Sequence, residues 1–211
     1  MLRTVTRVAG ALAALVGLAL TVLGVWFAAA LGGSGTAEFT ARPAAGAPVV
    51  IPPEVLNRVD ADVVVTATPT RGGSLWMALA NPSDATAVLG DSAHVRVSGV
   101  SVREWRLETT TTGSGEPPTL GTADLWRSQD DADGPVTMTV HQQDAPESVV
   151  VAAGRGSVAS VTLRVVDKRW FVESVVAVLV GLFLVAAGVV ALWPRRRPSA
   201  PLAPTDEEVA R

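Results

Sequence analysis

Two histidines and a scattered set of acids are the side chains best suited to catalysis or metal binding in this sequence. His94 and His141 each lie in a stretch rich in β-branched residues. A catalytic triad or a metal site would need serine or carboxylate partners, and no motif in the chain supplies them at a fixed spacing. We therefore expect structural or surface roles for both histidines, and we expect no catalytic residue, cofactor or metal ligand.

The acidic stretch Gln129–Gly134 (QDDADG) has part of the pattern of a calcium-binding loop. Asp131, Asp133 and Gly134 stand where an EF-hand places ligands and its turn glycine. The same register puts Val140 where the bidentate glutamate is required, so the EF-hand pattern fails. A solvated hairpin loop is the expected structure, with an adventitious divalent-ion site as the alternative.

Three tryptophans, Trp76, Trp105 and Trp126, lie in the middle of the chain, which has no tyrosine. Buried core positions are the expected role, because large aromatic side chains bury much apolar surface. The alternative is an exposed aromatic groove that binds a glycan or a peptide.

Two long apolar runs flank this middle region. Residues 8–31 contain one polar side chain, Thr21, and as a helix they would extend about 36 Å. Residues 175–193 contain no charged or hydroxyl side chain, and the second helix is predicted over residues 170–193. Both are predicted to be transmembrane helices. A cleaved signal peptide is the alternative for the first run, but its apolar stretch is longer than the roughly 7 to 15 residues of a signal core.

Basic residues before the first apolar run and after the second predict the orientation of the chain in the membrane. Cytoplasmic flanks of membrane helices are enriched in arginine and lysine. We therefore predict a cell-membrane protein with both termini, residues 1–7 and a disordered tail at 194–211, in the cytoplasm and its central domain outside. The cytoplasmic charges are Arg3, Arg7, Arg195, Arg196 and Arg197.

Aromatic and basic residues mark the predicted membrane boundaries. The pair Trp-Phe occurs at the end of the first run and again at the start of the second. Such rings favour the interface, where the indole N–H stays hydrated. The predicted interface anchors are Trp26, Phe27, Trp170, Phe171, Trp193, Lys168 and Arg169.

Glycines recur every seven residues in both runs. Seven residues make nearly two helical turns, so each set forms a smooth stripe against which another helix could pack closely. The residues are Gly10, Gly17, Gly24, Gly181 and Gly188. We expect the two helices to pack on each other, or on a partner, through these stripes; the alternative is the ordinary abundance of glycine in membrane helices.

The region between the runs divides into two parts. Residues 32–53 are rich in glycine, alanine and proline and are expected to form a stalk, with one strand near Phe39. Residues 54–169 contain short β-branched segments separated by turn residues, and several alternate with period two. Residues 100–109 and 123–128 are among these strand candidates. Together the segments predict one extracytoplasmic, mainly-β domain of about eight strands, an antiparallel sandwich or open barrel, with a short helix at residues 82–89.

Charge and cysteine content exclude some function classes. Residues 32–171 carry 16 acidic and 11 basic side chains, with no long basic run. Nucleic acid is therefore not an expected partner, since phosphate binding needs a clustered cationic surface. The chain has no cysteine, so an exported domain must rely on its core in place of disulfides.

Two segments resemble a known group of proteins. The run from Leu75 to Val97 (LWMALANPSDATAVLGDSAHVRV), and the later run from Ala123 to Gly154, are similar to the extracytoplasmic region of uncharacterised actinobacterial integral membrane proteins. In this resemblance a strand ending in small residues precedes a short acidic helix, His94 and a strand containing Trp126. The resemblance implies location and fold, and it implies no activity.

The sequence leads to two main functional expectations. The first is a non-enzymatic binding or accessory subunit of the cell envelope, whose partners are the lipid bilayer and another membrane protein or cell-wall component. The second is an extracytoplasmic hydrolase that acts on envelope glycan. A sensor is less favoured, because the tail after residue 194 is too short for a signalling domain.

Overall fold

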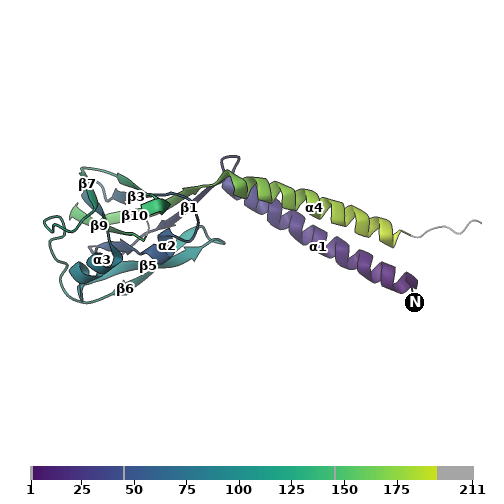
Figure 1. Ribbon diagram of the computed structural model, residues 1–211, viewed down its shortest axis with the longest axis horizontal. Helices are drawn as coiled ribbons and strands as arrows, with labels where there is room; N and C mark the ends of the chain where they lie inside the picture. Colours follow the sequence, from purple (N-terminus) through teal and green to yellow (C-terminus); the bar gives the residue numbers. More distant parts are fainter. Residues whose placement is uncertain (1, 45, 145, 194–211) are drawn as a thin grey trace, which may run out of the picture. The chain divides into compact units, whose positions relative to one another are not determined.

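Two apolar helices flank a β-rich domain in the computed structural model, which describes residues 2–44, 46–144 and 146–193 (Figure 1). The chain forms two compact units. One contains most of the two long helices, α1 (Leu2–Leu31) and α4 (Lys168–Leu192). The other is residues 27–173, which include the last turn of α1 and the first turn of α4.

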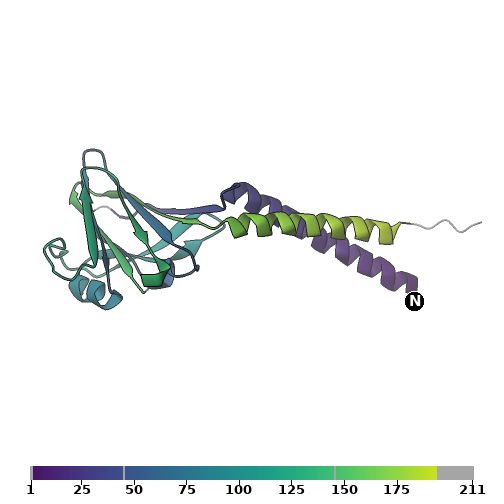
Figure 2. The same ribbon diagram turned by 45° about the horizontal axis from the view of Figure 1, so that its top comes forward.

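Ten strands form one sheet that curls into a nearly closed barrel (Figure 2). Their order across the sheet is β7-β4-β9-β2-β5-β6-β1-β10-β3-β8. The strands are β1 (Thr36–Ala41), β2 (Val49–Ile51), β3 (Val63–Pro69), β4 (Ser74–Ala80), β5 (His94–Ser101), β6 (Arg106–Thr112), β7 (Ser128–Ala132), β8 (Val136–Val140), β9 (Ser148–Arg155) and β10 (Val158–Val166).

Three short helices connect the strands: α2 (Pro53–Leu56), α3 (Pro82–Leu89) and the 3-10 turn η1 (Gln142–Asp144). The α3 boundaries are those expected from the sequence. Pro82 occupies the first helical turn, where its missing N–H costs nothing. Gly90 ends the helix with a φ of 48°, a conformation that suits glycine.

Most strand pairs are antiparallel, but two are parallel. β10 lies between β1 and β3 and pairs along nearly its whole length with both. β6 runs parallel to β1 and pairs with it at one position, Thr40 with Arg106, which is the shortest ladder between neighbouring strands of the described sheet. β2 pairs parallel with β5 and antiparallel with β9.

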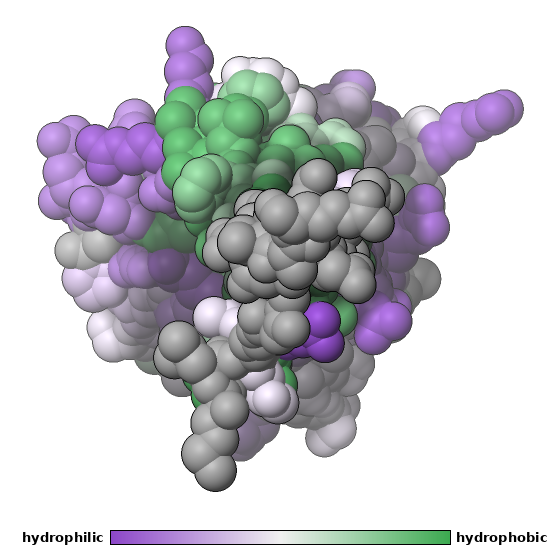
Figure 3. Space-filling model, turned by 90° about the vertical axis from the view of Figure 1, so that its right-hand side faces the viewer, coloured by the Kyte–Doolittle hydropathy of each residue, from purple (hydrophilic) through white to green (hydrophobic). Residues whose placement is uncertain are grey.

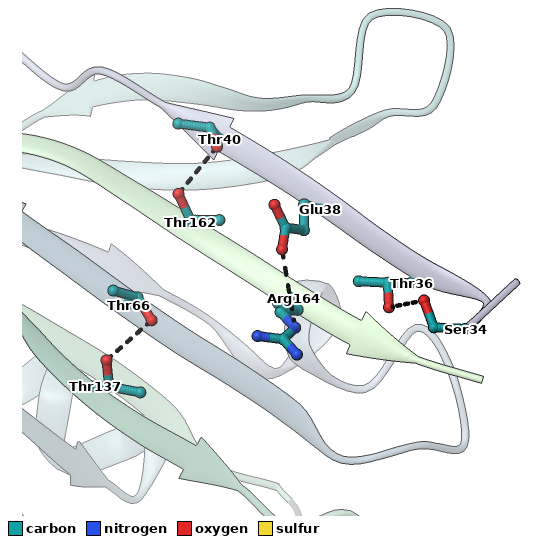
Figure 4. A network of polar contacts seen from close by, with 8 residues as sticks. All are labelled: Ser34, Thr36, Glu38, Thr40, Thr66, Thr137, Thr162 and Arg164. Atoms are coloured by element: carbon teal, nitrogen blue, oxygen red, sulfur yellow. Dashed lines mark hydrogen bonds and ion pairs between the residues drawn. The ribbon is translucent and has the colours of Figure 1, made fainter. Parts of the chain in front are cut away.

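Alternation along the strands places apolar side chains inside and polar ones outside, as the period of two requires. On the outer face of β1, β10, β3 and β8, threonine hydroxyls pair across neighbouring strands (Figure 4). Thr40 contacts Thr162 at 3.0 Å, and Thr66 contacts Thr137 at 3.0 Å. The largest fully buried side chains are Ile51, Leu56, Leu75 and Met77, followed by valines of β2, β3, β5, β8 and β9.

The expected stalk is wrong as an account of residues 32–53. β1 and β2 are integral strands, and β2 lies between β5 and β9 with all three of its residues buried. The turn residues around Pro43 and Pro48 separate the two strands, and they gave this stretch the composition of a linker. Three consecutive apolar residues with no alternation are typical of a strand buried on both faces.

Two strand boundaries also differ from expectation. The stretch expected as one strand at residues 100–109 is a hairpin, in which β5 and β6 are joined by a turn at 102–105. The expected strand at 123–128 is irregular, and β7 lies instead at Ser128–Ala132, inside the acidic stretch expected to be a loop. The pairing of β7 with the buried strand β4 overrides the poor β-propensity of its aspartates.

Gly35 joins α1 to β1 at a place where a side chain would not fit. Its φ is 66°, and an added Cβ would collide with the carbonyl oxygen of Asp167. The N–H of Asp167 donates to the Gly35 carbonyl at 3.0 Å. This close approach brings the start of β1 beside the end of β10, the two points where the β-domain meets its helices.

Candidate functional site

Both long helices expose apolar side chains over most of their surface. α1 and α4 are long and apolar enough to cross a membrane, and few of their residues are buried. Phe183 is 70% exposed and Val190 67%. Apolar residues gather on the helices in the end-on view of Figure 3. An apolar surface of this extent calls for a lipid or protein environment.

The predicted interface anchors differ in their surroundings. Phe27 and Trp170 are half-buried and pack against the core of the β-domain. Trp26 and Trp193 expose 39% and 71% of their surface. The remaining anchors lie at the start of α4: Phe171 is half-buried, and Lys168 and Arg169 are exposed.

The predicted cytoplasmic charges are mostly beyond the structure. Arg7 is exposed in the first turns of α1. The side chain of Arg3 and the whole of Arg195, Arg196 and Arg197 lie outside the described residues.

The glycine stripes of α1 and α4 face each other, and all five glycines are buried. A methyl group added at Gly17 would lie 2.5 Å from the carbonyl oxygen of Gly181. One added at Gly10 would lie 3.1 Å from the Gly188 oxygen and 2.9 Å from the Ala191 Cβ. The two helices therefore run antiparallel, with no room for a side chain at Gly17 and a slightly wider gap at Gly10, where the nearest atom is the Ala191 Cβ.

Ser174 completes this contact and was not predicted. A methyl group added at Gly24 would lie 2.8 Å from the Ser174 carbonyl oxygen. Ser174 is buried and stands seven residues before Gly181, which in turn stands seven before Gly188. Continuing the seven-residue spacing from Gly181 toward the N-terminus would have identified Ser174, because serine is also small enough for a close helix contact.

The two histidines lie in different surroundings. His94 is buried, and its Nδ1 lies 2.9 Å from the Ser92 carbonyl oxygen, to which it donates. That bond satisfies a buried polar group and indicates a structural role. His141 is half-exposed, just after β8, and its Nδ1 lies 2.8 Å from Oδ2 of Asp62.

The His141–Asp62 pair shifts the pKa of both groups. The hydrogen bond that the His141 imidazole donates to Asp62, together with the negative charge of Asp62, raises the pKa of His141. The same hydrogen bond, and a second from the Gln142 N–H at 3.1 Å, lower the pKa of Asp62. A histidine oriented by an aspartate is part of a general-base arrangement.

Glu147 is a buried acid that the sequence reasoning missed. It is 4% exposed, and its Oε1 lies 3.0 Å from Nη1 of Arg127. Burial raises the pKa of this carboxyl, and the charge of Arg127 partly opposes that rise. Arg127 also donates to the Asp144 carbonyl at 3.2 Å. One sequence offers no signal for this burial, because Glu147 lies in a turn-rich stretch.

The acids of the expected calcium loop are not gathered around a common point. Asp133 forms an ion pair with Arg155 at 2.6 Å, and Asp130 accepts from the N–H of Asp131 at 2.9 Å. Within the described parts of the chain, no group of three or more histidine or acidic side chains is placed to hold a metal ion.

Trp76 and Trp126 pack against each other beside a surface hollow. Their ring centroids are 4.9 Å apart, in an edge-to-face arrangement. The Trp126 Nε1 donates to the Leu120 carbonyl at 2.8 Å, a bond within the loop between β6 and β7. The Trp76 Nε1 donates to Oε1 of Gln129 at 3.1 Å. Both rings are therefore held in place by their polar ends.

The hollow has a volume of about 460 Å³ and is mostly apolar. Trp76 and the small residues of β9 line one side, and the loop containing Pro117 and Pro118 lines the other. Among the described residues that line it, Glu116 is the one ionisable side chain. Apolar walls, an aromatic ring and few polar groups are typical of ligand sites. Trp105 lies elsewhere and stacks on Phe39 at 5.4 Å.

Comparison of the chain with protein-family models, curated proteins and solved structures yields no match. The resemblance to actinobacterial membrane proteins therefore stays a prediction, and a functional assignment has to rest on geometry.

Proposed function

We propose that this chain is an integral membrane protein that crosses the cytoplasmic membrane twice and presents its β-domain outside as a non-enzymatic binding module. The exposed apolar surfaces of α1 and α4 support the membrane location. Side chains such as Phe183, which is 70% exposed, would each lose about 1.5 to 3 kcal/mol of burial free energy in water.

The orientation has both termini in the cytoplasm, supported by the basic flanks of the two helices. Because the chain has no cysteine, one introduced cysteine reports its own location. Thr110→Cys on exposed β6 should react with a membrane-impermeant maleimide on intact cells. Thr4→Cys, at the start of α1, should react only after lysis. The reverse pattern would overturn the topology.

The Trp76 hollow carries the binding proposal. The flat indole face can stack against the apolar C–H face of a pyranose ring, and the volume of about 460 Å³ is within the range of small-molecule sites. Retaining and inverting glycosidases need two carboxyl groups, whereas Glu116 is the single acid among the described lining residues. A cell-wall glycan that is bound and not cleaved is the ligand this geometry favours.

The direct test is a titration of the full chain in lipid nanodiscs with a tetrasaccharide of N-acetylglucosamine, followed by tryptophan fluorescence. We expect saturable binding that weakens at least about tenfold in Trp76→Ala, since a buried aromatic contact typically contributes more than 1.4 kcal/mol. Trp105→Ala is the matched control and should bind as the wild type does. Equal affinity in Trp76→Ala, or no binding by the wild type, would contradict the glycan site.

A hydrolase is the second candidate, and the His141–Asp62 pair favours it. Their 2.8 Å contact orients the imidazole as a general base would require. Hydrolysis products released from purified peptidoglycan by the wild type, but not by His141→Ala, would favour hydrolysis over simple binding. An accessory role predicts in addition that a specific membrane protein co-purifies in mild detergent.

A further inference from the structure

A second groove lies where α1 gives way to the β-domain. It has a volume of about 430 Å³ and is lined by Ala29, Ala30, Leu31, Gly32, Thr36, Glu38 and Trp105. The last turn of the apolar helix forms one wall, and Ala29 and Ala30 are exposed. Ala29, Ala30 and Leu31 therefore give this groove an apolar wall.

The register of the sheet explains why Trp105 reaches this place. β6 runs parallel to β1, with Arg106 opposite Thr40. Residues that precede Arg106 therefore lie alongside the start of β1, close to where the chain leaves α1. The turn at residues 102–105 consequently lies at the end of the β-domain where β1 begins and β10 ends.

Trp105 is held firmly in an uncommon backbone conformation. Its φ is 51°, in the left-handed region that a bulky residue rarely adopts. The ring stacks on Phe39 with an interplanar angle of 26°, and its carbonyl accepts from the Thr40 N–H at 3.3 Å. Strained conformations of this kind persist where the surroundings fix them, and they cluster at functional sites.

The charges around the turn leave a basic tip. Glu104 forms an ion pair with Arg106 at 2.7 Å, and Glu38 lies 3.8 Å from Arg164 (Figure 4). The acid of the turn, Glu104, and the acid that lines the groove, Glu38, are thus each beside an arginine. Val102, 40% exposed, and the exposed Arg103 form the rest of the turn. Apolar, basic and aromatic side chains together are typical of a membrane-interface segment.

We propose that the turn Val102–Trp105 dips into the outer leaflet and that the groove beneath Trp105 holds the glycerol and upper acyl chain of a phospholipid. Arg103 is placed to contact an anionic headgroup, and Val102 enters the apolar boundary. This inference rests on the proposed membrane location. It adds a third attachment, so that the β-domain touches the bilayer in addition to its two helices.

Six variants that each retain a single tryptophan, with the other five changed to phenylalanine, provide the test. The full chain is reconstituted in vesicles of equal phosphatidylglycerol and phosphatidylcholine whose acyl chains are brominated near the headgroup. Emission of the Trp105-only variant should fall about twofold, because an interfacial indole lies within contact of such chains. The Trp126-only variant is the control and should keep its emission.

Two outcomes separate this inference from the proposed membrane location. Quenching of the Trp170-only variant without quenching of the Trp105-only variant would overturn the lipid groove and leave membrane insertion intact. Quenching of neither would overturn both. Replacing Arg103 with glutamine in the Trp105-only variant should reduce quenching in the anionic vesicles. Unchanged quenching would contradict the proposed contact between Arg103 and the headgroup.

A cysteine probe keeps the proposal testable where a single-tryptophan variant does not fold. Val102→Cys carries an environment-sensitive fluorophore, and Asp133→Cys, in the β7–β8 turn, is its control. The register places that turn at the opposite end of the sheet, because Val136 pairs with Ala67 whereas Val63 pairs with Val165. Vesicle reconstitution should blue-shift the Val102 probe alone. Equal emission from both probes would overturn the proposal.

Discussion

Oε1 of Glu147 lies 3.0 Å from Nη1 of Arg127, but only the arginine is substantially exposed, at 44% against 5% for the glutamate side chain. The pair is therefore asymmetric: the carboxylate loses its hydration on folding and the guanidinium largely keeps it. Burial of the acid outweighs the attraction between the charges, which is why the pKa of Glu147 rises.

This asymmetry predicts a pH-dependent effect of Glu147→Gln. A raised acid pKa means that the folded state binds the proton more tightly, so stability falls as pH rises above the ordinary value of 4.5 and through the raised value. Glutamine carries no such cost. In thermal unfolding of the full chain, the melting temperature of the variant should rise relative to that of the wild type as the pH increases from about 4 to about 8. The exposed Glu108→Gln is the control, and a pH-independent difference for Glu147→Gln would contradict the prediction.

The His141–Asp62 pair should stabilise the domain within a defined pH window. Because the pKa of His141 is raised, its contribution to stability is fully present below the ordinary value of 6.5 and is lost as pH rises through the raised pKa. Because the pKa of Asp62 is lowered, its contribution to stability is present above the ordinary value of 3.8 and is lost as pH falls through the lowered pKa. The melting-temperature deficit of Asp62→Asn should be largest between these two ordinary values and shrink at alkaline pH. A constant deficit would assign the effect to the Gln142 N–H bond alone.

Ile51 tests whether residues 32–53 belong to the fold. Its side chain is 0% exposed in β2, so Ile51→Ala should lower the free energy of unfolding by about 2 to 5 kcal/mol through lost burial and a cavity. Val166→Ala, at a position 46% exposed, is the control with little expected effect. Denaturant unfolding measures both free energies. A negligible change for Ile51→Ala would indicate that residues 32–53 are a linker and not part of the folded core.

The glycine contact between α1 and α4 can be tested by crosslinking. The pair Gly10→Cys and Ala191→Cys should form a disulfide readily, because an added Cβ at residue 10 lies beside that of Ala191. Adding Gly17→Leu should reduce the yield severalfold, since a Cβ there would already lie 2.5 Å from backbone. Ala19→Leu, on an exposed position of the same helix, is the control. Equal yields in the two leucine variants would contradict the contact.

The sequence by itself determined the features that depend on local pattern. Two long apolar runs became α1 and α4, because an uninterrupted apolar stretch permits few other structures. The short helix was expected at residues 82–89, where α3 lies, and the glycine heptads indicated where each long helix is smooth. Period-two alternation identified most of the strands. Each of these signals is contained within one segment of the chain.

Tertiary structure alone decided what depends on partners distant in sequence. β2 is a core strand because β5 and β9 provide its hydrogen bonds, although its flanking residues read as a linker. The aspartates of β7 form a strand because β4 pairs with them. Glu147 is buried beside Arg127, and the 102–105 turn lies beside α1 only because β6 runs parallel to β1. Hydrogen-bond pairing and burial are non-local, so one segment's composition does not encode them.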